Sequence, residues 1–225
     1  MNIEKIYNDL KEIKTYNGEE QNKLEKILKE LQVEIITNGK VNKGILSTAK
    51  KIFKEMVHRP IFEQVFNSQS GNYCICNGYA LIDYGKNKEN VPKELYPYIN
   101  INKDYEKPNF CYEVLKNDSI KYKEVLKIKD IEKVYKYNKT QNTDNEVQYV
   151  LGNNNVLFRP SLMLDFIKLS GIKLNEIEVE YGEQKSPINL NFKDENIKAI
   201  VLPIFCKEEK AKENYAKFKE IMEID

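Results

Sequence analysis

Three residues of this chain stand in an order that suggests metal chemistry. Asp165, Glu183 and Lys185 follow the D…E-x-K order of metal-dependent nucleases, in which carboxylates hold Mg²⁺ and a lysine steadies the attacking water. However, Glu183 and Lys185 belong to an expected turn that begins at Gly182 rather than to a central strand. Their side chains are therefore not expected to converge with Asp165, and a nuclease is the less favoured alternative.

Thiols and the single histidine offer a second route to catalysis. Cys74 and Cys76 stand two apart on an expected strand, and His58 is the only histidine. A nucleophile and its base must lie within hydrogen-bond reach, and the spacing of these residues does not determine that geometry. The sequence has no C-x-x-C-like zinc knuckle and no Gly-rich phosphate loop. We expect a binding protein rather than an enzyme, with no catalytic residue, no metal and no cofactor.

Composition narrows the partners and the compartment. Charged residues make up 32% of the 225 residues and the net charge is +1, so no strong overall field indicates a nucleic-acid or membrane partner. No apolar run reaches the roughly 18 residues of a membrane span, and the first residues lack the pattern of a signal peptide. Four cysteines do not form a disulfide framework in a chain of this length. These features predict a cytoplasmic protein with reduced thiols.

The elements that must position any site follow a repeated order. In the second half, a strand at 156–158 precedes a helix at 161–170, and alternating apolar residues predict strands at 176–181, 188–192 and 198–205. The same order, strand, helix, strand, strand, is expected across residues 33–84, with its helix at 47–56 and its strands at 33–37, 61–67 and 72–84. The prediction is an α+β fold of two β-α-β-β-β units, with their helices side by side on one face of antiparallel sheets.

Three further segments complete the expected organisation. Residues 1–32 predict two amphipathic helices, which form either an oligomerisation or docking arm or a hairpin packed on its own domain. Residues 33–206 form the central domain or domains, with a Lys/Asn/Tyr-rich middle segment at 85–145. That segment has an expected strand near 122–128 and a helix at 130–137. Residues 207–225 predict a C-terminal helix.

Four short motifs resemble one family, the bacterial replicative sliding clamps. Phe158-Arg-Pro-Ser-Leu-Met-Leu-Asp-Phe-Ile167 resembles the Phe-Asn-x-x-Tyr-x-x-Asp-x-Leu segment that opens the last clamp helix, with Arg159 in place of asparagine and Leu162 in place of tyrosine. Val201-Leu-Pro-Ile-Phe205 is similar to the terminal Val-Met-Pro-Met-Arg of clamps, with Phe205 in place of arginine.

The other two motifs lie in the first half of the chain. Arg59-Pro-Ile-Phe-Glu-Gln-Val65 resembles the Arg-Pro-Ile/Leu-x-x-Val strand of clamps, and Cys76-Asn-Gly-Tyr-Ala-Leu81 resembles their Thr-Asp-Gly-His/Tyr-Arg-Leu turn. The four motifs occur in the family's order and cover roughly residues 33–84 and 146–206, so residues 33–206 are the clamp-like part of the chain. Because clamp subunits have two or three complete domains, the resemblance suggests a shortened relative of phage or mobile-element type.

The resemblance implies a non-enzymatic protein of DNA replication that holds duplex DNA without sequence specificity, assembles as a homo-oligomer, and binds short peptides of replication proteins in a groove. The groove positions that match this chain are apolar or lie in the turn: Gly78, Tyr79, Leu81, Leu162, Val201, Leu202, Pro203 and Ile204. Without the resemblance, the same residues would be expected to fill a core.

The resemblance also implies helices that face DNA with basic side chains. The candidates for that role are Lys50, Lys51, Lys54, Arg159, Lys168 and Lys173. A charged, solvated helix face is the commoner explanation of such a pattern. A third interpretation keeps the clamp-like fold and the peptide groove without DNA, as a protein-interaction module. Salt-sensitive retention on duplex DNA would separate the two.

Overall fold

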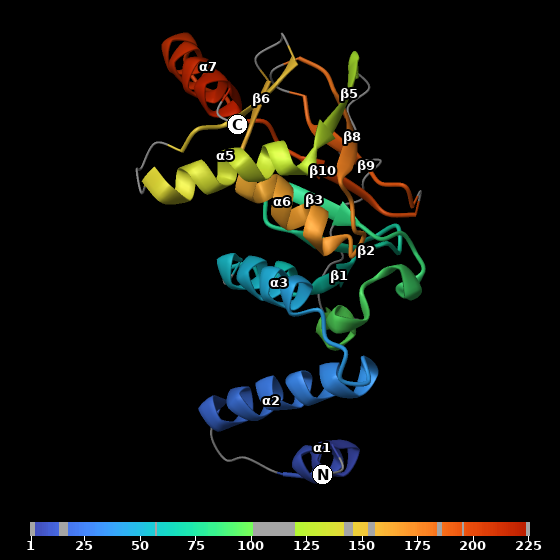
Figure 1. The fold of residues 1–225 in the computed structure, drawn as a ribbon. Coiled ribbons are helices and arrows are strands. Elements are labelled where there is room, and N and C mark those ends of the chain that lie inside the picture. Colours follow the sequence, from blue (N-terminus) through green and yellow to red (C-terminus); the bar gives the residue numbers. More distant parts are fainter. Residues whose placement is uncertain are drawn as a thin grey trace.

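One mixed sheet forms the centre of the molecule. The structure, a computed structural model, describes residues 3–13, 18–56, 58–100, 120–141, 146–152, 156–183, 186–194 and 196–223. Within these residues a sheet of eight strands has the order β4-β1-β2-β3-β10-β9-β8-β5 (Figure 1). Its strands are β1 (Val65–Asn67), β2 (Tyr73–Cys76), β3 (Ala80–Asp83), β4 (Ile99–Asn100), β5 (Tyr122–Lys127), β8 (Glu176–Tyr181), β9 (Ile188–Asn191) and β10 (Lys198–Val201).

The strand order reveals two related halves. The meander β1-β2-β3 meets the meander β8-β9-β10 through the antiparallel pair β3–β10, in which Leu81 lies opposite Ile200. Neighbouring strands are antiparallel apart from the parallel pair β1–β4. Each meander follows a helix, α3 (Lys43–Glu55) in the first half and α6 (Pro160–Leu169) in the second. The weak repeat in the sequence therefore corresponds to two structural halves joined at the middle of one sheet.

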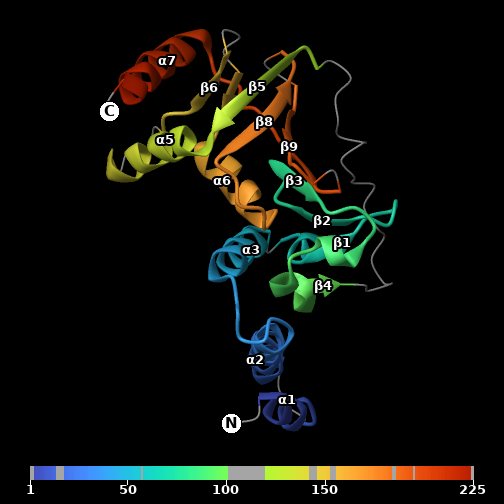
Figure 2. The same cartoon turned by 45° about the vertical axis from the view of Figure 1, so that its right-hand side comes forward.

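The helices α3 and α6, together with α5 (Ile128–Gln141), cover one face of the sheet (Figures 1 and 2). Helix α3 begins where the Asn42 side chain accepts hydrogen bonds from the backbone N–H groups of Gly44 and Ile45, at 3.1 and 3.3 Å. Its buried residues, which include Ala49 and Ile52, form a stripe toward the sheet. The α+β class with both repeat helices on one face is confirmed.

Both faces of the central strands are buried. Side chains alternate along a strand, so Ala80 and Ile82 of β3 point into the large core under the helices. The intervening Leu81 points to the opposite face, where it joins a second cluster with Phe62, Phe66, Cys74, Cys76 and Ile200. This second cluster explains why these strands read as continuous apolar runs rather than as an alternation of apolar and polar residues.

Four expected strands differ in the structure. The strand expected at 72–84 is divided into β2 and β3 by a turn in which the Asn77 side chain accepts two backbone hydrogen bonds. Residues 33–36 complete helix α2 (Gly18–Ile36), so the strand expected at 33–37 and the boundary placed at residue 32 fall on a helix. Residues 61–62 lie in a 3-10 helix (Pro60–Phe62), closed by the Phe62 N–H on the Arg59 carbonyl at 2.8 Å, which leaves only Val65–Asn67 as strand. The last strand ends at Val201 because Pro203 has no N–H for a ladder.

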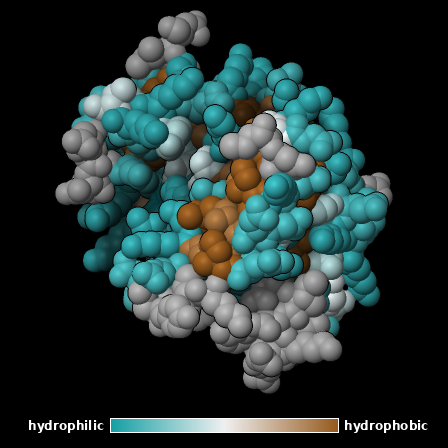
Figure 3. Space-filling model, turned by 90° about the horizontal axis from the view of Figure 1, so that it is seen from below, coloured by the Kyte–Doolittle hydropathy of each residue, from teal (hydrophilic) through white to brown (hydrophobic). Residues whose placement is uncertain are grey.

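The N-terminal hairpin consists of α1 (Ile3–Lys11) and α2, which pack on each other. Helix α2 also contacts the 3-10 helix Lys93–Tyr98, and it buries Leu24 and Val33. Helix α1 has no buried residue. Figure 3, seen from the side of α1, shows an apolar area bordered by hydrophilic residues, and exposed apolar side chains of this hairpin are Ile3, Ile13 and Ile27.

The C-terminal part packs around a small hairpin of β6 (Tyr149–Leu151) and β7 (Val156–Phe158). Helix α7 (Glu208–Glu223), as expected from the sequence, places Phe218 edge-on against Tyr149, with ring centroids 4.9 Å apart. Helix α5 is longer at both ends than the expected 130–137. The described helices include none that is both long and apolar enough to cross a bilayer.

Candidate functional site

An open pocket of about 590 Å³ lies between helices α3 and α6 and the turn that joins β2 to β3. These three elements come from distant parts of the chain, and the sheet topology brings them together at one end of the helices. We name this cavity the α6 pocket. Its lining residues are Lys51, Glu55, Met56, His58, Arg59, Asn77, Gly78, Tyr79, Arg159, Ser161, Leu162 and Asp165.

The β2–β3 turn is held in one shape by its own hydrogen bonds. The Asn77 side-chain oxygen accepts from the N–H groups of Tyr79 and Ala80, at 3.1 and 3.0 Å. Gly78 has a φ of 84°, a backbone conformation in which a residue with a side chain would be strained. This geometry presents Tyr79 to solvent, 66% exposed, at the edge of the α6 pocket.

Two backbone hydrogen bonds hold the segment after β10 against the β2–β3 turn and strand β7. The Leu202 N–H donates to the Tyr79 carbonyl, and the Ile204 N–H donates to the Leu157 carbonyl, both at 2.8 Å. Leu202 is exposed and Pro203 is half-buried. The segment therefore runs from the β2–β3 turn to strand β7.

The structure divides the eight groove residues expected from the resemblance. Gly78, Tyr79 and Leu162 line the α6 pocket, and Leu202 lies beside it through its bond to Tyr79. Ile204 lines a second pocket. Leu81 and Val201 are 1% and 0% exposed, so these two residues belong to the core on opposite faces of the sheet. For them the core interpretation is correct, because both faces of β3 and β10 are covered.

The second pocket, of about 570 Å³, lies between α7 and the β6–β7 hairpin, and we name it the α7 pocket. Arg159 lines both pockets.

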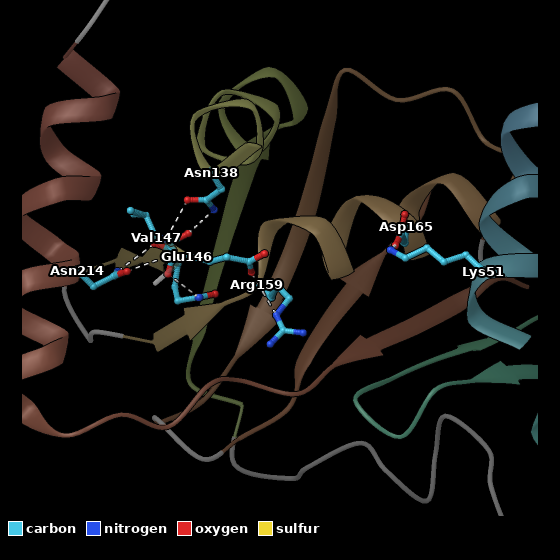
Figure 4. Close-up of polar contacts among 8 residues, drawn as sticks. Lys51, Asn138, Glu146, Val147, Arg159, Asp165 and Asn214 are labelled. Carbon is cyan, nitrogen blue, oxygen red and sulfur yellow. Dashed lines mark hydrogen bonds and ion pairs between the residues drawn. The ribbon is translucent and has the colours of Figure 1, made fainter. Parts of the chain in front are cut away.

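Two asparagine side chains hold the segment that enters β6 (Figure 4). Asn138 of α5 exchanges two hydrogen bonds of 2.8 Å with the backbone of Val147. Asn214 of α7 does the same with Gln148, at 2.6 and 3.0 Å.

Charges are unevenly distributed around the α6 pocket. Lys51 of α3 forms an ion pair with Asp165 of α6 at 2.8 Å (Figure 4). Burial lowers the pKa of Lys51, but its hydrogen bond to Asp165 and the charges of Asp165 and Glu55 outweigh burial, and the pKa is raised overall. The Nε of Arg159 lies 3.6 Å from a Glu146 carboxylate oxygen, and both side chains remain about half exposed. The acidic groups thus gather at the Lys51 end of the pocket.

The lysines expected to face DNA are partly neutralised. Lys50 forms an ion pair with Glu30 of α2 at 2.8 Å, and Lys51 is paired with Asp165. Lys54, Lys168 and Lys173 are exposed. Arg159 lies at the two pockets rather than among these lysines. The α3 strip is therefore less basic than its sequence suggests.

Neither catalytic alternative gains support from the geometry. Asp165 is engaged by Lys51 and Glu183 by Lys121, the latter at 2.6 Å, while Lys185 lies outside the described residues. Within the described ranges, no group of three His, Cys, Asp or Glu side chains is placed to hold a metal. Burial raises the pKa of the Cys76 thiol, the opposite of what an activated nucleophile requires.

Several lining residues of the α6 pocket are not expected from the sequence. Met56 carries no distinctive pattern in the sequence, His58 is notable only as the single histidine, and Asn77 stands in the turn motif without an expected role. Arg59 belongs to the Arg-Pro motif, but the motif does not predict that its side chain lines the α6 pocket. Lys51, Arg159 and Asp165 have other expected roles, and only the packing of α3 against α6 places them at this pocket.

Solved structures with a similar arrangement of helices and strands exist. They are bacterial sliding clamps. The Thermotoga maritima DNA polymerase III beta subunit is 16% identical, with a TM-score of 0.35, and the match covers 60% of this chain and 42% of that chain. The Bacillus subtilis DNA polymerase sliding clamp is 11% identical, with a TM-score of 0.43 and coverages of 70% and 63%.

A third clamp, from Helicobacter pylori and bound to a DNA ligase peptide, is 11% identical, with a TM-score of 0.46 and coverages of 72% and 63%. This chain thus spans less than two thirds of the length of these three clamps. At these identities the similarity concerns the fold alone. No protein-family model and no curated protein matches the chain.

Proposed function

We propose that this protein is a non-enzymatic, clamp-like protein that binds extended peptides of replication proteins in the α6 pocket. One observation carries the proposal. Gly78, Tyr79 and Leu162, which the clamp-like motifs assign to a peptide groove, come from segments some 80 residues apart and line one open pocket. Core residues would be buried instead, as Leu81 and Val201 are.

The surfaces around the α6 pocket suit a peptide ligand. Tyr79 offers an exposed aromatic ring, Leu162 is half-buried, and Leu202 is 39% exposed on the segment bonded to Tyr79. Apolar anchors that enter such a pocket supply most of the affinity of a short peptide. The open rim leaves space for an extended chain on either side of the anchors.

Peptide binding is tested directly with fluorescently labelled peptides that have an aliphatic and an aromatic anchor in sequence. We expect saturable binding to the parent protein and its loss in a Tyr79→Asp variant, which adds a charge at the pocket edge. Tyr79 is exposed, so the fold should be retained, as circular dichroism would verify. A matched Tyr215→Asp change on α7, outside both pockets, should leave binding intact. Equal binding by all three proteins would refute the α6 pocket as the site.

Peptide binding is the part of this proposal that the side-chain contacts favour. Two of the three α3 lysines form ion pairs within the protein, so less of their positive charge is available to neutralise DNA phosphates. Duplex DNA stays a prediction for the α3 lysines, and charge reversal of these lysines tests it separately. A DNA-independent interaction module would bind the peptide and show no salt-sensitive retention on DNA.

A further inference from the structure

Two arginines of the α6 pocket are only weakly paired with acidic side chains. Glu55 and Asp165 both act on Lys51, so the two carboxylates more than offset the charge of this lysine. Arg59 and Arg159 also line the pocket, both are exposed, and among the described residues neither forms an ion pair with Glu55 or Asp165. Arg159 has one long ion pair, with its Nε 3.6 Å from a Glu146 carboxylate oxygen, and its side chain remains 54% exposed.

The start of helix α6 adds to this imbalance. Arg159 is the N-cap residue, yet its side chain makes no capping hydrogen bond. Pro160 follows as the first helical residue and has no N–H. The next backbone N–H groups belong to Ser161 and Leu162, which line the α6 pocket. The positive end of the helix dipole and two guanidinium groups thus border the same cavity as the apolar anchors Tyr79 and Leu162.

We infer that the α6 pocket selects an extended peptide that carries a carboxylate side chain next to its apolar anchor. The inference rests on the proposed function and adds the chemistry of the ligand. The anchor contacts Tyr79 and Leu162, while the carboxylate lies between Arg59 and Arg159. Guanidinium groups form short, charge-assisted hydrogen bonds with carboxylates, so they discriminate an acid from its uncharged amide.

Other charges around the pocket limit which peptides fit. A basic residue on the ligand would be repelled by Arg59 and Arg159, so a peptide that carries one should bind more weakly. An acid placed too far along the peptide would approach Glu55 and Asp165, and those carboxylates would repel it. The pocket therefore favours one acidic position close to the anchor over an evenly acidic chain.

Two pairs of end-blocked, labelled peptides test this inference. One pair is Ala-Glu-Glu-Leu-Phe-Ala and Ala-Gln-Gln-Leu-Phe-Ala, and the other places the Glu or Gln pair after Leu-Phe. Fluorescence anisotropy at low salt should give the better Glu peptide a Kd about tenfold below that of its Gln partner. The gap should shrink as salt is added, because the rim of the pocket is exposed. This comparison uses the parent protein and needs no variant.

Variants then assign the effect to residues. In Arg59→Gln, in Arg159→Gln and in the double variant, the ratio of the Gln-peptide Kd to the Glu-peptide Kd should fall stepwise from about ten toward one. The control Lys86→Gln removes an exposed positive charge outside both pockets and should preserve the tenfold gap. All four proteins should show the same circular dichroism spectrum.

The outcomes separate this inference from the proposed function. If the parent binds Glu and Gln peptides equally well, the carboxylate selection is wrong and peptide binding stands. A gap that survives in the double variant also overturns the assignment to Arg59 and Arg159. If no peptide binds up to millimolar concentration, the proposed function itself fails and the inference fails with it.

Discussion

Leu162 shows at the level of one residue how exposure distinguishes a binding position from a core position. It lies on the first turn of α6, half-buried, on the wall of the α6 pocket. Leu81, which the same motifs assign to the groove, is 1% exposed under Phe62 and Phe66. The two leucines have the same expected role, but a charged substitution should destabilise the fold far more at Leu81 than at Leu162.

We expect Leu162→Asp to fold and to lose peptide binding. The aspartate at position 162 can keep its carboxylate in water at the pocket rim, so unfolding in urea should shift little. Leu81→Asp is the matched control, because its charge would be buried without a partner at a cost of several kcal/mol. Circular dichroism and urea titration should show an intact first variant and a largely unfolded second one. A folded Leu162→Asp variant with parental peptide affinity would contradict the proposed site.

Tyr181 at the end of β8 predicts an alkaline transition. Its hydroxyl donates to a Glu124 carboxylate oxygen at 3.1 Å, and its side chain is 3% exposed. Burial, and then the charge of Glu124, raise the pKa of Tyr181 to about 12, above the ordinary value of 10.0. A group with a raised folded pKa contributes stability that is fully present below pH 10 and is lost as the pH rises through the folded pKa.

The free energy of unfolding should therefore fall between pH 10 and 12, and the fall should be shallower in Tyr181→Phe, which has no hydroxyl to ionise. Urea unfolding at a series of pH values measures both slopes. Tyr215→Phe removes a hydroxyl from the exposed face of α7 and should keep the parental slope. Identical slopes in the parent and in Tyr181→Phe would show that Tyr181 does not govern the transition.

At the level of elements, helix α3 has two possible surfaces, one toward the α6 pocket and one toward solvent. Lys51 lies on the pocket side, where it pairs with Asp165 of α6, whereas Lys50 pairs with Glu30 of α2 and Lys54 is exposed. Exposed ion pairs contribute at most about 1 kcal/mol each to stability, so replacing the lysines should not unfold the protein.

For duplex DNA, we expect the variant with Lys50, Lys51 and Lys54 changed to Glu to bind more weakly than the parent by a similar factor for every sequence. The slope of log affinity against log salt should decrease by about 0.9 for each phosphate that the variant no longer neutralises. Electrophoretic mobility shifts at several salt concentrations measure both quantities. The control changes Lys212 and Lys219 of α7 and the adjacent Lys207 to Glu, with the same net charge. Equal weakening in the two variants would assign the effect to net charge and exclude a specific role of α3.

Helix α7 is attached to the body largely by side-chain packing and by one asparagine. Asn214 satisfies both backbone groups of Gln148 just before β6, as a neighbouring strand would. Asn214→Leu leaves those groups unpaired, and it should lower the free energy of unfolding by about 1–3 kcal/mol. Urea titration provides the value. Lys212→Leu on the exposed side of α7 is the control and should change stability by much less. An unaffected Asn214→Leu variant would mean that water replaces the side chain without cost.

On the scale of the whole molecule, the joint between the two halves is the most protected region. Strands β3 and β10 are paired over four residues and are covered on both faces, by the large core and by the second cluster. Helix α1, in contrast, buries no residue. Hydrogen exchange followed by mass spectrometry should therefore find the slowest amides in β3 and β10 and the fastest of the described helices in α1. Fast exchange in β10 would contradict one continuous sheet.

Elements with a long and regular hydrophobic pattern are predictable from the sequence. The stripe of α3, the alternation of Glu176–Tyr181 and the amphipathic α7 are all predicted to within a few residues. The repeated order of a helix followed by strands is also visible in the sequence, although residues 72–84 predict one strand and the structure has two, β2 and β3. Local periodicity carries this information, because burial on one side of an element repeats at 3.6 or 2 residues.

Which apolar side chains stay accessible to a ligand depends on the packing of distant segments. Residues 33–36 predict a strand because they are rich in apolar, β-branched side chains, yet they continue α2, where Val33 packs inside. Leu81, Leu162 and Val201 carry the same apolar signal in the sequence, but only Leu162 lines a pocket. Exposure depends on what covers a side chain from elsewhere in the chain. Phe62 and Phe66 close over Leu81, whereas the turn at Gly78 stops short of Leu162 and leaves the α6 pocket open.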